Sequence, residues 1–175
     1  MDKIQLAREI YQVSHLTGDF LLRSGQRSHE YFDKYRFESN PKILRQIAKE
    51  LVSLLPAQFD LIAGLEMGGI PIATALSLET GIPAVFVRKK AKNYGTCKAA
   101  EGGEIRGKRL VIIEDIITTG GQVVLSAQDL RAAGAIVGPV LCVIDRSKSV
   151  NPDILNSGLE LKSLFTAAQL AQAVK

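Results

Sequence analysis

Residues 110–121 read L-V-I-I-E-D-I-I-T-T-G-G, and this stretch decides the fold class of the chain. Residues 110–113 form an apolar run that predicts a buried strand. Residues 122–133 follow with the pattern of a helix. A turn of small residues between a strand and a helix N-terminus is typical of an anion site, because backbone N–H groups and the helix dipole face the ligand.

Two acidic residues, Glu114 and Asp115, distinguish this stretch from a simple phosphate-binding turn. Carboxylates repel phosphate, but they can hold ribose hydroxyls, as an acid does in dinucleotide sites. The sequence therefore predicts a site for a phosphorylated sugar. The alternative interpretation is an ordinary strand-to-helix turn with two solvated acids.

The bulk properties fit one domain over residues 1–175, because 46% hydrophobic residues suffice for a sizeable core. The chain lacks an apolar run of membrane-spanning length, and its N-terminus lacks a signal-peptide core, so we expect a cytoplasmic protein without a membrane partner. A net charge of +4 does not predict nucleic-acid binding. Cys97 and Cys142 have no metal-ligand spacing.

Strands and helices alternate along most of the chain. We expect strands at residues 20–22, 31–37, 61–64, 83–87, 110–113, 136–144 and 159–164, and helices at 2–16, 41–55, 69–80, 122–133 and 167–174. This order predicts an α/β fold with a mainly parallel central sheet flanked by helices. Ligands in such sheets bind at the carboxyl ends of the strands, where the charged and Gly-rich segments of this sequence fall.

A second Gly-rich turn, G-L-E-M-G-G, occupies residues 64–69 between a predicted strand and a predicted helix. It is not a Walker A loop, because no Gly-Lys-Ser/Thr follows. The turn suits an anion at another helix N-terminus, and the ligand would then carry two separated phosphate groups. The alternative is a tight turn whose glycines serve only the backbone geometry.

Residues 112–121 resemble the phosphoribosyl pyrophosphate loop of type I phosphoribosyltransferases. The resemblance implies that Glu114 and Asp115 bind the ribose hydroxyls and that the Thr-rich turn binds the 5′-phosphate. It also implies that the turn at residues 64–69 binds the pyrophosphate. The implied contacts of phosphoribosyl pyrophosphate are Met67, Gly68, Gly69, Arg88, Lys89, Lys92, Tyr94, Glu114, Asp115, Ile116, Ile117, Thr118, Thr119, Gly120, Gly121 and Gln122.

Residues 88–96, R-K-K-A-K-N-Y-G-T, are similar to the segment that opens the catalytic loop of orotate phosphoribosyltransferases. The resemblance implies a mobile loop over about residues 90–106 that closes over the substrate and excludes water. Tyr94 stands where many family members have His. The implied cations at the departing pyrophosphate are Arg88, Lys89 and Lys92, and the implied catalytic residues are Lys89, Lys92 and Asp115.

Two further segments resemble the orotate-binding parts of the same family. Residues 22–28 with Tyr31 and Phe32 match its N-terminal motif, and residues 1–40 would form a small N-terminal hood. Arg146 ends a predicted strand, and an Arg can hold a carboxylate through two N–H groups. The implied orotate contacts are Arg23, Tyr31, Phe32, Thr118 and Arg146.

The whole resemblance implies a homodimeric enzyme that joins orotate to phosphoribosyl pyrophosphate, giving orotidine 5′-phosphate and pyrophosphate in pyrimidine (UMP) biosynthesis. It implies Mg²⁺ as cofactor, held mainly by substrate and water rather than by side chains. One alternative is a phosphoribosyltransferase for uracil, xanthine or hypoxanthine. Another is a non-catalytic regulator that senses phosphoribosyl pyrophosphate, although the segment before Ser24 is too short for a full DNA-binding module. An unrelated nucleotide-binding α/β protein is the third, without a G-x-G-x-x-G or Walker A motif to favour it.

Overall fold

The structure is a computed structural model that describes residues 1–21, 25–89, 99–147 and 152–175. Its strands are β1 (His15–Leu21), β2 (Arg27–Phe32), β3 (Leu61–Leu65), β4 (Ala84–Val87), β5 (Ala100–Glu101), β6 (Arg109–Ile117), β7 (Ile136–Asp145) and β8 (Leu161–Thr166). Its helices are α1 (Lys3–Ser14), α2 (Tyr35–Glu38), α3 (Pro41–Val52), α4 (Gly69–Thr80), α5 (Gly121–Ala132), α6 (Pro152–Asn156) and α7 (Ala167–Gln172).

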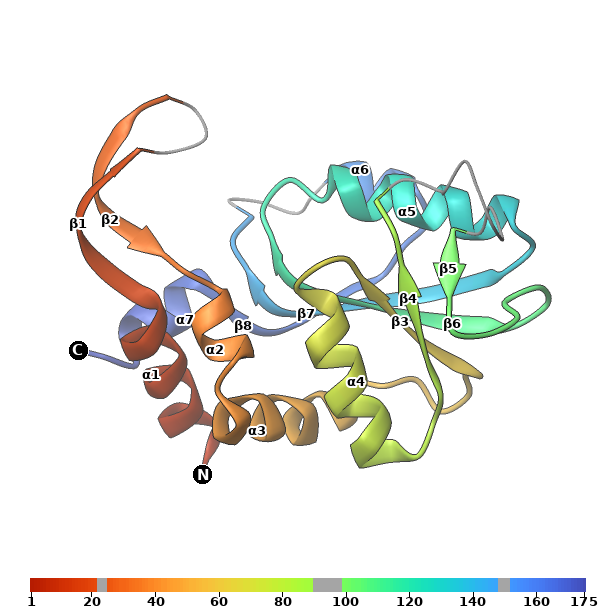
Figure 1. Cartoon of the computed structure of the whole chain (residues 1–175), viewed down its shortest axis with the longest axis horizontal. Helices are drawn as coiled ribbons and strands as arrows, with labels where there is room; N and C mark the ends of the chain where they lie inside the picture. Colours follow the sequence, from red (N-terminus) through yellow and green to blue (C-terminus); the bar gives the residue numbers. More distant parts are fainter. Residues whose placement is uncertain (22–24, 90–98, 148–151) are drawn as a thin grey trace.

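Among the described residues, six strands form one sheet in the order β5-β4-β3-β6-β7-β8, and β1 pairs with β2 in a separate hairpin (Figure 1). Every pairing in the large sheet is parallel except that of β4 with β5. The central strand β6 separates the two halves of the sheet. The predicted α/β fold with a mainly parallel sheet is confirmed.

The apolar residues of the central strands alternate between two cores, as the period of two in a strand requires. Val111 and Ile113 pack into the core shared with α1, α3 and α4, and Ile112 packs into the core shared with α5. Figure 1 shows α3 and α4 below the sheet and α5 and α6 above it. Both faces are covered, which explains the continuous apolar run at the start of β6.

The start of α3 follows the sequence signal. The Asn40 side chain accepts hydrogen bonds from the backbone N–H groups of Lys42 (3.1 Å) and Ile43 (3.3 Å). Pro41 occupies the first turn, where its missing N–H leaves no partner unsatisfied. The helix therefore begins where the sequence predicts.

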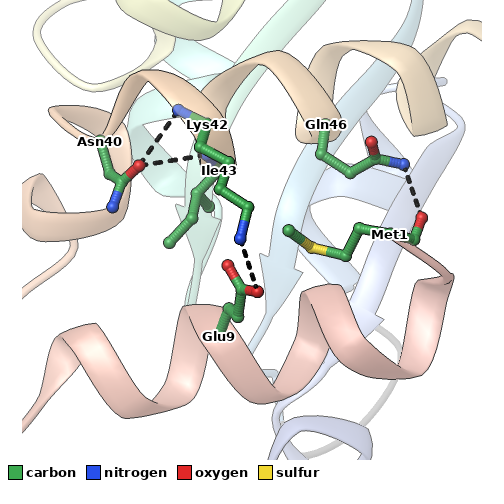
Figure 2. Close-up of polar contacts among 6 residues, drawn as sticks. All are labelled: Met1, Glu9, Asn40, Lys42, Ile43 and Gln46. Carbon is green, nitrogen blue, oxygen red and sulfur yellow. Dashed lines mark hydrogen bonds and ion pairs between the residues drawn. The ribbon is translucent and has the colours of Figure 1, made fainter.

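Polar contacts join α3 to α1, and Figure 2 shows the two helices side by side. Lys42 Nζ lies 3.1 Å from Glu9 Oε1, and Gln46 Nε2 donates to the Met1 carbonyl oxygen at 3.1 Å. The buried residues of α1 are Leu6, Ala7, Ile10 and Ser14, whereas Ile4 is 66% exposed.

Strand β6 is longer than the sequence predicts. It was expected to end at Ile113, but it continues to Ile117 and carries both acids within the strand. Its pairing with β3 ends at Ile113, and only β7 accompanies it further, with Glu114 opposite Cys142. The two acids thus lie on a strand end that projects beyond β3, at the carboxyl edge of the sheet.

The N-terminal region departs most from the expected elements. The sequence predicts a strand over residues 31–37, but β2 ends at Phe32 and the chain turns into α2. Asp33 Oδ1 accepts a hydrogen bond from the Tyr35 N–H at 3.2 Å and fixes the start of this turn. Figure 1 shows the β1–β2 hairpin extending away from the sheet.

The expected loop over residues 90–106 also contains regular structure. Residues 90–98 lie outside the described part of the chain, but Ala100 and Glu101 form β5 along β4. Ile105 is only 7% exposed. Strand β5 and helix α6 were not predicted, because each is too short to leave a periodic pattern. Within the described residues, no helix has both the length and the apolar character needed to cross a membrane.

Candidate active site

A cavity of about 490 Å³ lies at the carboxyl ends of β3, β4 and β6. Ligands of parallel α/β sheets bind at this edge. Its walls come from the start of α2, the turn after β3, the end of β4 and the connection from β6 into α5. The lining residues are Lys34, Tyr35, Glu66, Met67, Lys89, Glu114, Ile116, Ile117, Thr118, Thr119, Gly120, Gly121, Gln122 and Val123.

The N-terminus of α5 forms one wall of this cavity. Gly120 precedes the helix with φ at +71°, a left-handed conformation that glycine adopts with little strain. The N-cap residue Gly120 makes no side-chain cap hydrogen bond, and the first residues of the helix line the cavity. The N–H groups of the first turn and the helix dipole therefore favour an anion at this position.

The glycines of the turn after β3 are explained by packing. A Cβ atom on Gly68 would stand 1.6 Å from Asp115 Oδ2, and one on Gly69 would stand 2.2 Å from the Ile113 carbonyl oxygen. Both residues are buried and lie outside the cavity lining, whereas Glu66 and Met67 belong to it. Close packing therefore explains why these positions are glycine, and the predicted binding of an anion at this turn stays a prediction.

The two acids of β6 have different surroundings. Glu114 lines the cavity, whereas Asp115 is 0% exposed and does not reach the cavity in this conformation. Asp115 Oδ2 lies 2.5 Å from Lys34 Nζ, and Asp115 Oδ1 accepts a hydrogen bond from the Ile116 N–H. The predicted pair of ribose-binding acids is thus divided into one acid at the cavity surface and one behind it.

Three neighbouring acids, Glu38, Glu114 and Asp115, differ in pKa, and Asp115 is the one that carries the negative charge. Burial raises the pKa of Glu38 to about 9, and the neighbouring Asp115 carboxylate adds to the shift. Burial also raises the pKa of Glu114 well above its usual range. Burial alone would raise the pKa of Asp115, but hydrogen bonds with Glu114 and Lys34 hold it below its ordinary value. The ionised carboxylate of Asp115 is therefore paired with the ammonium group of Lys34.

Lys89 lines the cavity beside the turn after β3, and its contact with pyrophosphate stays a prediction. Its backbone N–H donates to Glu66 Oε1 at 2.7 Å, which ties the end of β4 to that turn. Arg88 is half-buried and outside the lining, and its backbone N–H donates to the Ala99 carbonyl oxygen at 3.0 Å. The predicted contacts Lys92 and Tyr94 lie outside the described residues.

A second cavity of about 450 Å³ brings together three of the predicted orotate contacts, Tyr31, Phe32 and Arg146. The Arg146 guanidinium carbon lies 6.0 Å from the centre of the Phe32 ring, within the range of a cation–π contact. The backbone N–H of Arg146 donates to the Ile117 carbonyl oxygen at 2.8 Å, so the second cavity adjoins the wall of the first. Thr118 lines the first cavity instead, and Arg23 lies outside the described residues.

Sequence reasoning missed Lys34, Tyr35 and Glu66 in the first cavity. The first two were hidden by the incorrect strand over residues 31–37. Asp33 offered the correcting signal, because Asp is typical of the residue that precedes a helical turn. Glu66 gave no usable signal, since a carboxylate is not expected in an anion site.

Comparisons with known proteins agree with this geometry. Residues 36–160 match the family model of the phosphoribosyl transferase domain. The orotate phosphoribosyltransferase of Nocardioides sp. is 54% identical over 168 residues, which cover 96% of this chain and 94% of that protein.

Solved structures give the same result. Orotate phosphoribosyltransferase of Mycobacterium tuberculosis in complex with Fe(III) dicitrate superposes with a TM-score of 0.87 at 29% identity, covering 97% of this chain and 99% of that chain. A second crystal structure of that enzyme, in complex with phosphoribosyl pyrophosphate, has a TM-score of 0.83 at 27% identity and covers 98% and 99%. The chain belongs to the orotate phosphoribosyltransferases of the phosphoribosyl transferase domain family.

Proposed function

We propose that this chain transfers the phosphoribosyl group of phosphoribosyl pyrophosphate to orotate, releasing pyrophosphate and forming orotidine 5′-phosphate for pyrimidine synthesis. The observation that carries the proposal is the first cavity, in which the N-terminus of α5, the Glu114 carboxyl and the Lys89 side chain share one opening. A sugar with phosphate at both ends matches that set of groups. The names of the relatives supply the class of reaction.

We assign the parts of phosphoribosyl pyrophosphate by the charge of the groups around them. The 5′-phosphate binds at the turn before α5, where Thr118, Thr119 and Gly121 line the cavity. Glu114 faces the ribose hydroxyls. The pyrophosphate lies toward Met67 and Lys89, at the turn after β3.

Orotate is assigned to the adjoining cavity. Its carboxylate is expected to accept two N–H groups from Arg146, and its flat ring to lie against Phe32. Ile117 joins the two sites, since its carbonyl oxygen accepts from the Arg146 N–H. This backbone link supports the assignment of the base to a position next to the sugar.

The chemistry requires no nucleophilic side chain. The bond between ribose C1 and the pyrophosphate oxygen breaks, and a ring nitrogen of orotate forms the new bond to C1. Negative charge develops on the pyrophosphate, so cations such as Lys89 stabilise the transition state. Lys92 remains a predicted cation of the same kind.

We propose Mg²⁺ as the cofactor. The carboxyl groups that line the first cavity, Glu66 and Glu114, are the hard oxygen donors that Mg²⁺ accepts. Within the described residues, no three His, Cys, Asp or Glu side chains gather into a metal site. We expect the metal to bind mainly to substrate oxygens and water, and to neutralise charge on the pyrophosphate.

We also propose a homodimer, in which the β1–β2 hairpin belongs to the interface. Leu21 is 73% exposed and Tyr31 is 44% exposed on this hairpin. Apolar side chains on an extended hairpin gain free energy when a second copy covers them. Sedimentation should give twice the mass of one chain, and Leu21→Lys should shift the mass toward one chain.

The proposed reaction is tested by turnover of the purified protein with four bases in parallel. Orotate, uracil, xanthine and hypoxanthine are each supplied with phosphoribosyl pyrophosphate and Mg²⁺, and pyrophosphate release is measured. Release with orotate alone is expected. Release with another base instead of orotate would support phosphoribosyl transfer but contradict orotate as the substrate. Binding of phosphoribosyl pyrophosphate without turnover of any base would favour a non-catalytic regulator.

A further inference from the structure

Three acidic side chains and one lysine meet behind the wall of the first cavity. Asp115 is 0% exposed and Glu38 is 5% exposed, and Glu114 beside them reaches the cavity. Burying a carboxylate is costly even when it is paired, and apolar residues of similar size often give equal stability. Stability alone therefore does not account for this cluster.

Lys34 is the cation of the cluster, and it reaches the cavity. Its side chain is 33% exposed and lines the wall, while its Nζ atom lies 2.5 Å from Asp115 Oδ2. Burial opposes the charge, but Asp115 outweighs burial and raises the pKa of Lys34. An ammonium has three N–H donors, and one carboxylate oxygen takes one of them. Lys34 thus offers a fixed positive charge at the cavity wall.

The position of this charge follows from the packing of Gly68. A Cβ atom there would stand 1.6 Å from Asp115 Oδ2 and 2.8 Å from Glu38 Oε1, so both carboxyl groups press against the turn after β3. Lys34 is paired with that same Oδ2 atom. Its ammonium is therefore beside the turn to which the pyrophosphate is assigned.

We propose that Lys34 binds the pyrophosphate of phosphoribosyl pyrophosphate, and that Asp115 and Glu38 are positioning residues that act through Lys34. The inference rests on the proposed function, because it names a further residue of that site. Asp115 holds the ammonium at the wall, and the Glu38 carboxyl group lies close to the Asp115 carboxylate, next to Gly68. A direct contact of Asp115 with ribose would instead require this carboxylate to leave Lys34.

The first test compares Lys34→Met, Lys34→Arg and the wild type in the orotate reaction. A hydrogen bond to a charged group changes affinity by about 10- to 100-fold, so Lys34→Met should raise KM for phosphoribosyl pyrophosphate by that factor. KM for orotate should differ by less than about threefold between Lys34→Met and the wild type. Lys34→Arg keeps the charge and should recover most of the affinity. Lys42→Met, which removes an exposed lysine of α3, is the control.

A binding measurement separates this inference from the proposed reaction. Calorimetry with pyrophosphate and Mg²⁺ needs no turnover, and Lys34→Met should weaken binding by the same factor as KM. Ribose 5-phosphate should bind both proteins equally. Equal pyrophosphate affinity for Lys34→Met and the wild type would overturn the inference. A wild type that binds pyrophosphate but turns over no orotate would overturn the proposed function and leave the inference standing.

The role of Asp115 is tested by a double-mutant cycle. If Asp115 acts through Lys34, Asp115→Asn should weaken pyrophosphate binding in the wild type and change it by less than about twofold when Lys34 is already Met. If Asp115 holds ribose directly, its substitution should weaken ribose 5-phosphate binding in both backgrounds, and the positioning role would be excluded.

The role of Glu38 is tested by two substitutions. Glu38→Gln keeps a hydrogen-bond donor of nearly the same shape and should retain wild-type pyrophosphate affinity near neutral pH. Glu38→Ala opens the buried side of Asp115 and should weaken the affinity in the same direction as Lys34→Met. Wild-type affinity in Glu38→Ala, with a folded protein by circular dichroism, would remove Glu38 from the proposal.

Discussion

Gly68 stands directly against the carboxylate of Asp115, so that a Cβ atom on Gly68 would lie 1.6 Å from Oδ2. The acid is buried within β6 and cannot withdraw without leaving Lys34. A side chain at residue 68 would therefore displace the Asp115 carboxylate from this position.

This contact predicts the effect of Gly68→Ala. Overpacking of this kind costs about 1–3 kcal/mol, and the displaced acid should also weaken pyrophosphate binding. Urea unfolding of Gly68→Ala and Gly103→Ala measures the first effect. Gly103 is the matched control, because a Cβ atom there would meet only Val85 Cγ1 at the ordinary distance of 3.6 Å. Equal unfolding free energies for the two variants would contradict the packing described.

Glu38 should make stability depend on pH. Its pKa in the folded protein is about 9, above the ordinary value of 4.5, so the folded chain retains a proton that the unfolded chain releases. The contribution of Glu38 is fully present below about pH 4.5 and is lost as the pH rises toward 9. Glu38→Gln cannot release this proton, so the variant should gain stability relative to the wild type between pH 5 and pH 8.5. If the unfolding free energies of Glu38→Gln and the wild type, measured in urea, changed by the same amount across this pH range, a raised pKa of Glu38 would be excluded.

Asp60 and Arg109 join the starts of β3 and β6, at the opposite edge of the sheet from the site. Asp60 Oδ2 accepts from the Arg109 backbone N–H (2.7 Å) and Nε (3.2 Å), and these hydrogen bonds lower the pKa of Asp60 to about 2. Asp60→Asn should therefore be less stable than the wild type at neutral pH. The deficit should shrink as the pH falls below the ordinary pKa of 3.8 toward 2.

Thermal unfolding at several pH values measures this deficit. Asp129→Asn, which changes an exposed acid of α5, is the control. Asp60→Asn should also leave both Michaelis constants unchanged, because the residue is outside both cavities. A loss of orotate affinity would show that this end of the sheet influences the site.

Arg146 should determine the affinity for the base. If Arg146 holds the orotate carboxylate as proposed, Arg146→Ala removes that two-point contact, so KM for orotate should rise about 10- to 100-fold, with a smaller change for phosphoribosyl pyrophosphate. Arg146→Lys should recover little, because an ammonium cannot reproduce the planar pair of donors. Steady-state kinetics with the exposed Arg45→Ala as control measures this. An unchanged KM for orotate would reopen the identity of the base.

The local elements were predictable where a few neighbouring residues determine them. Asn40 and Pro41 start α3, and α4 runs over Gly69–Thr80 as its pattern indicates. The end of β6 was not predictable, because pairing with β7 extends the strand through two acids that would otherwise end it. Strand β5 depends in the same way on its neighbour β4.

The candidate site also combines features that neighbouring residues determine with features that depend on tertiary packing. The turn around Thr118 and the cation Arg146 follow from residue types near the ends of strands. The pairing of Lys34 with Asp115 and the packing of Gly68 against Asp115 do not, because these residues come from three separate segments. Such contacts depend on how three segments pack together: α2, β6 and the turn that follows β3. A local sequence pattern does not predict this packing.

The most direct measurement follows the ultraviolet absorbance of orotate in the presence of the purified protein, phosphoribosyl pyrophosphate and Mg²⁺. We expect a loss of absorbance that requires both phosphoribosyl pyrophosphate and metal, with one pyrophosphate released for each orotate consumed. Unchanged absorbance, in a folded protein that releases pyrophosphate with a different base, would contradict the assignment of orotate as the substrate.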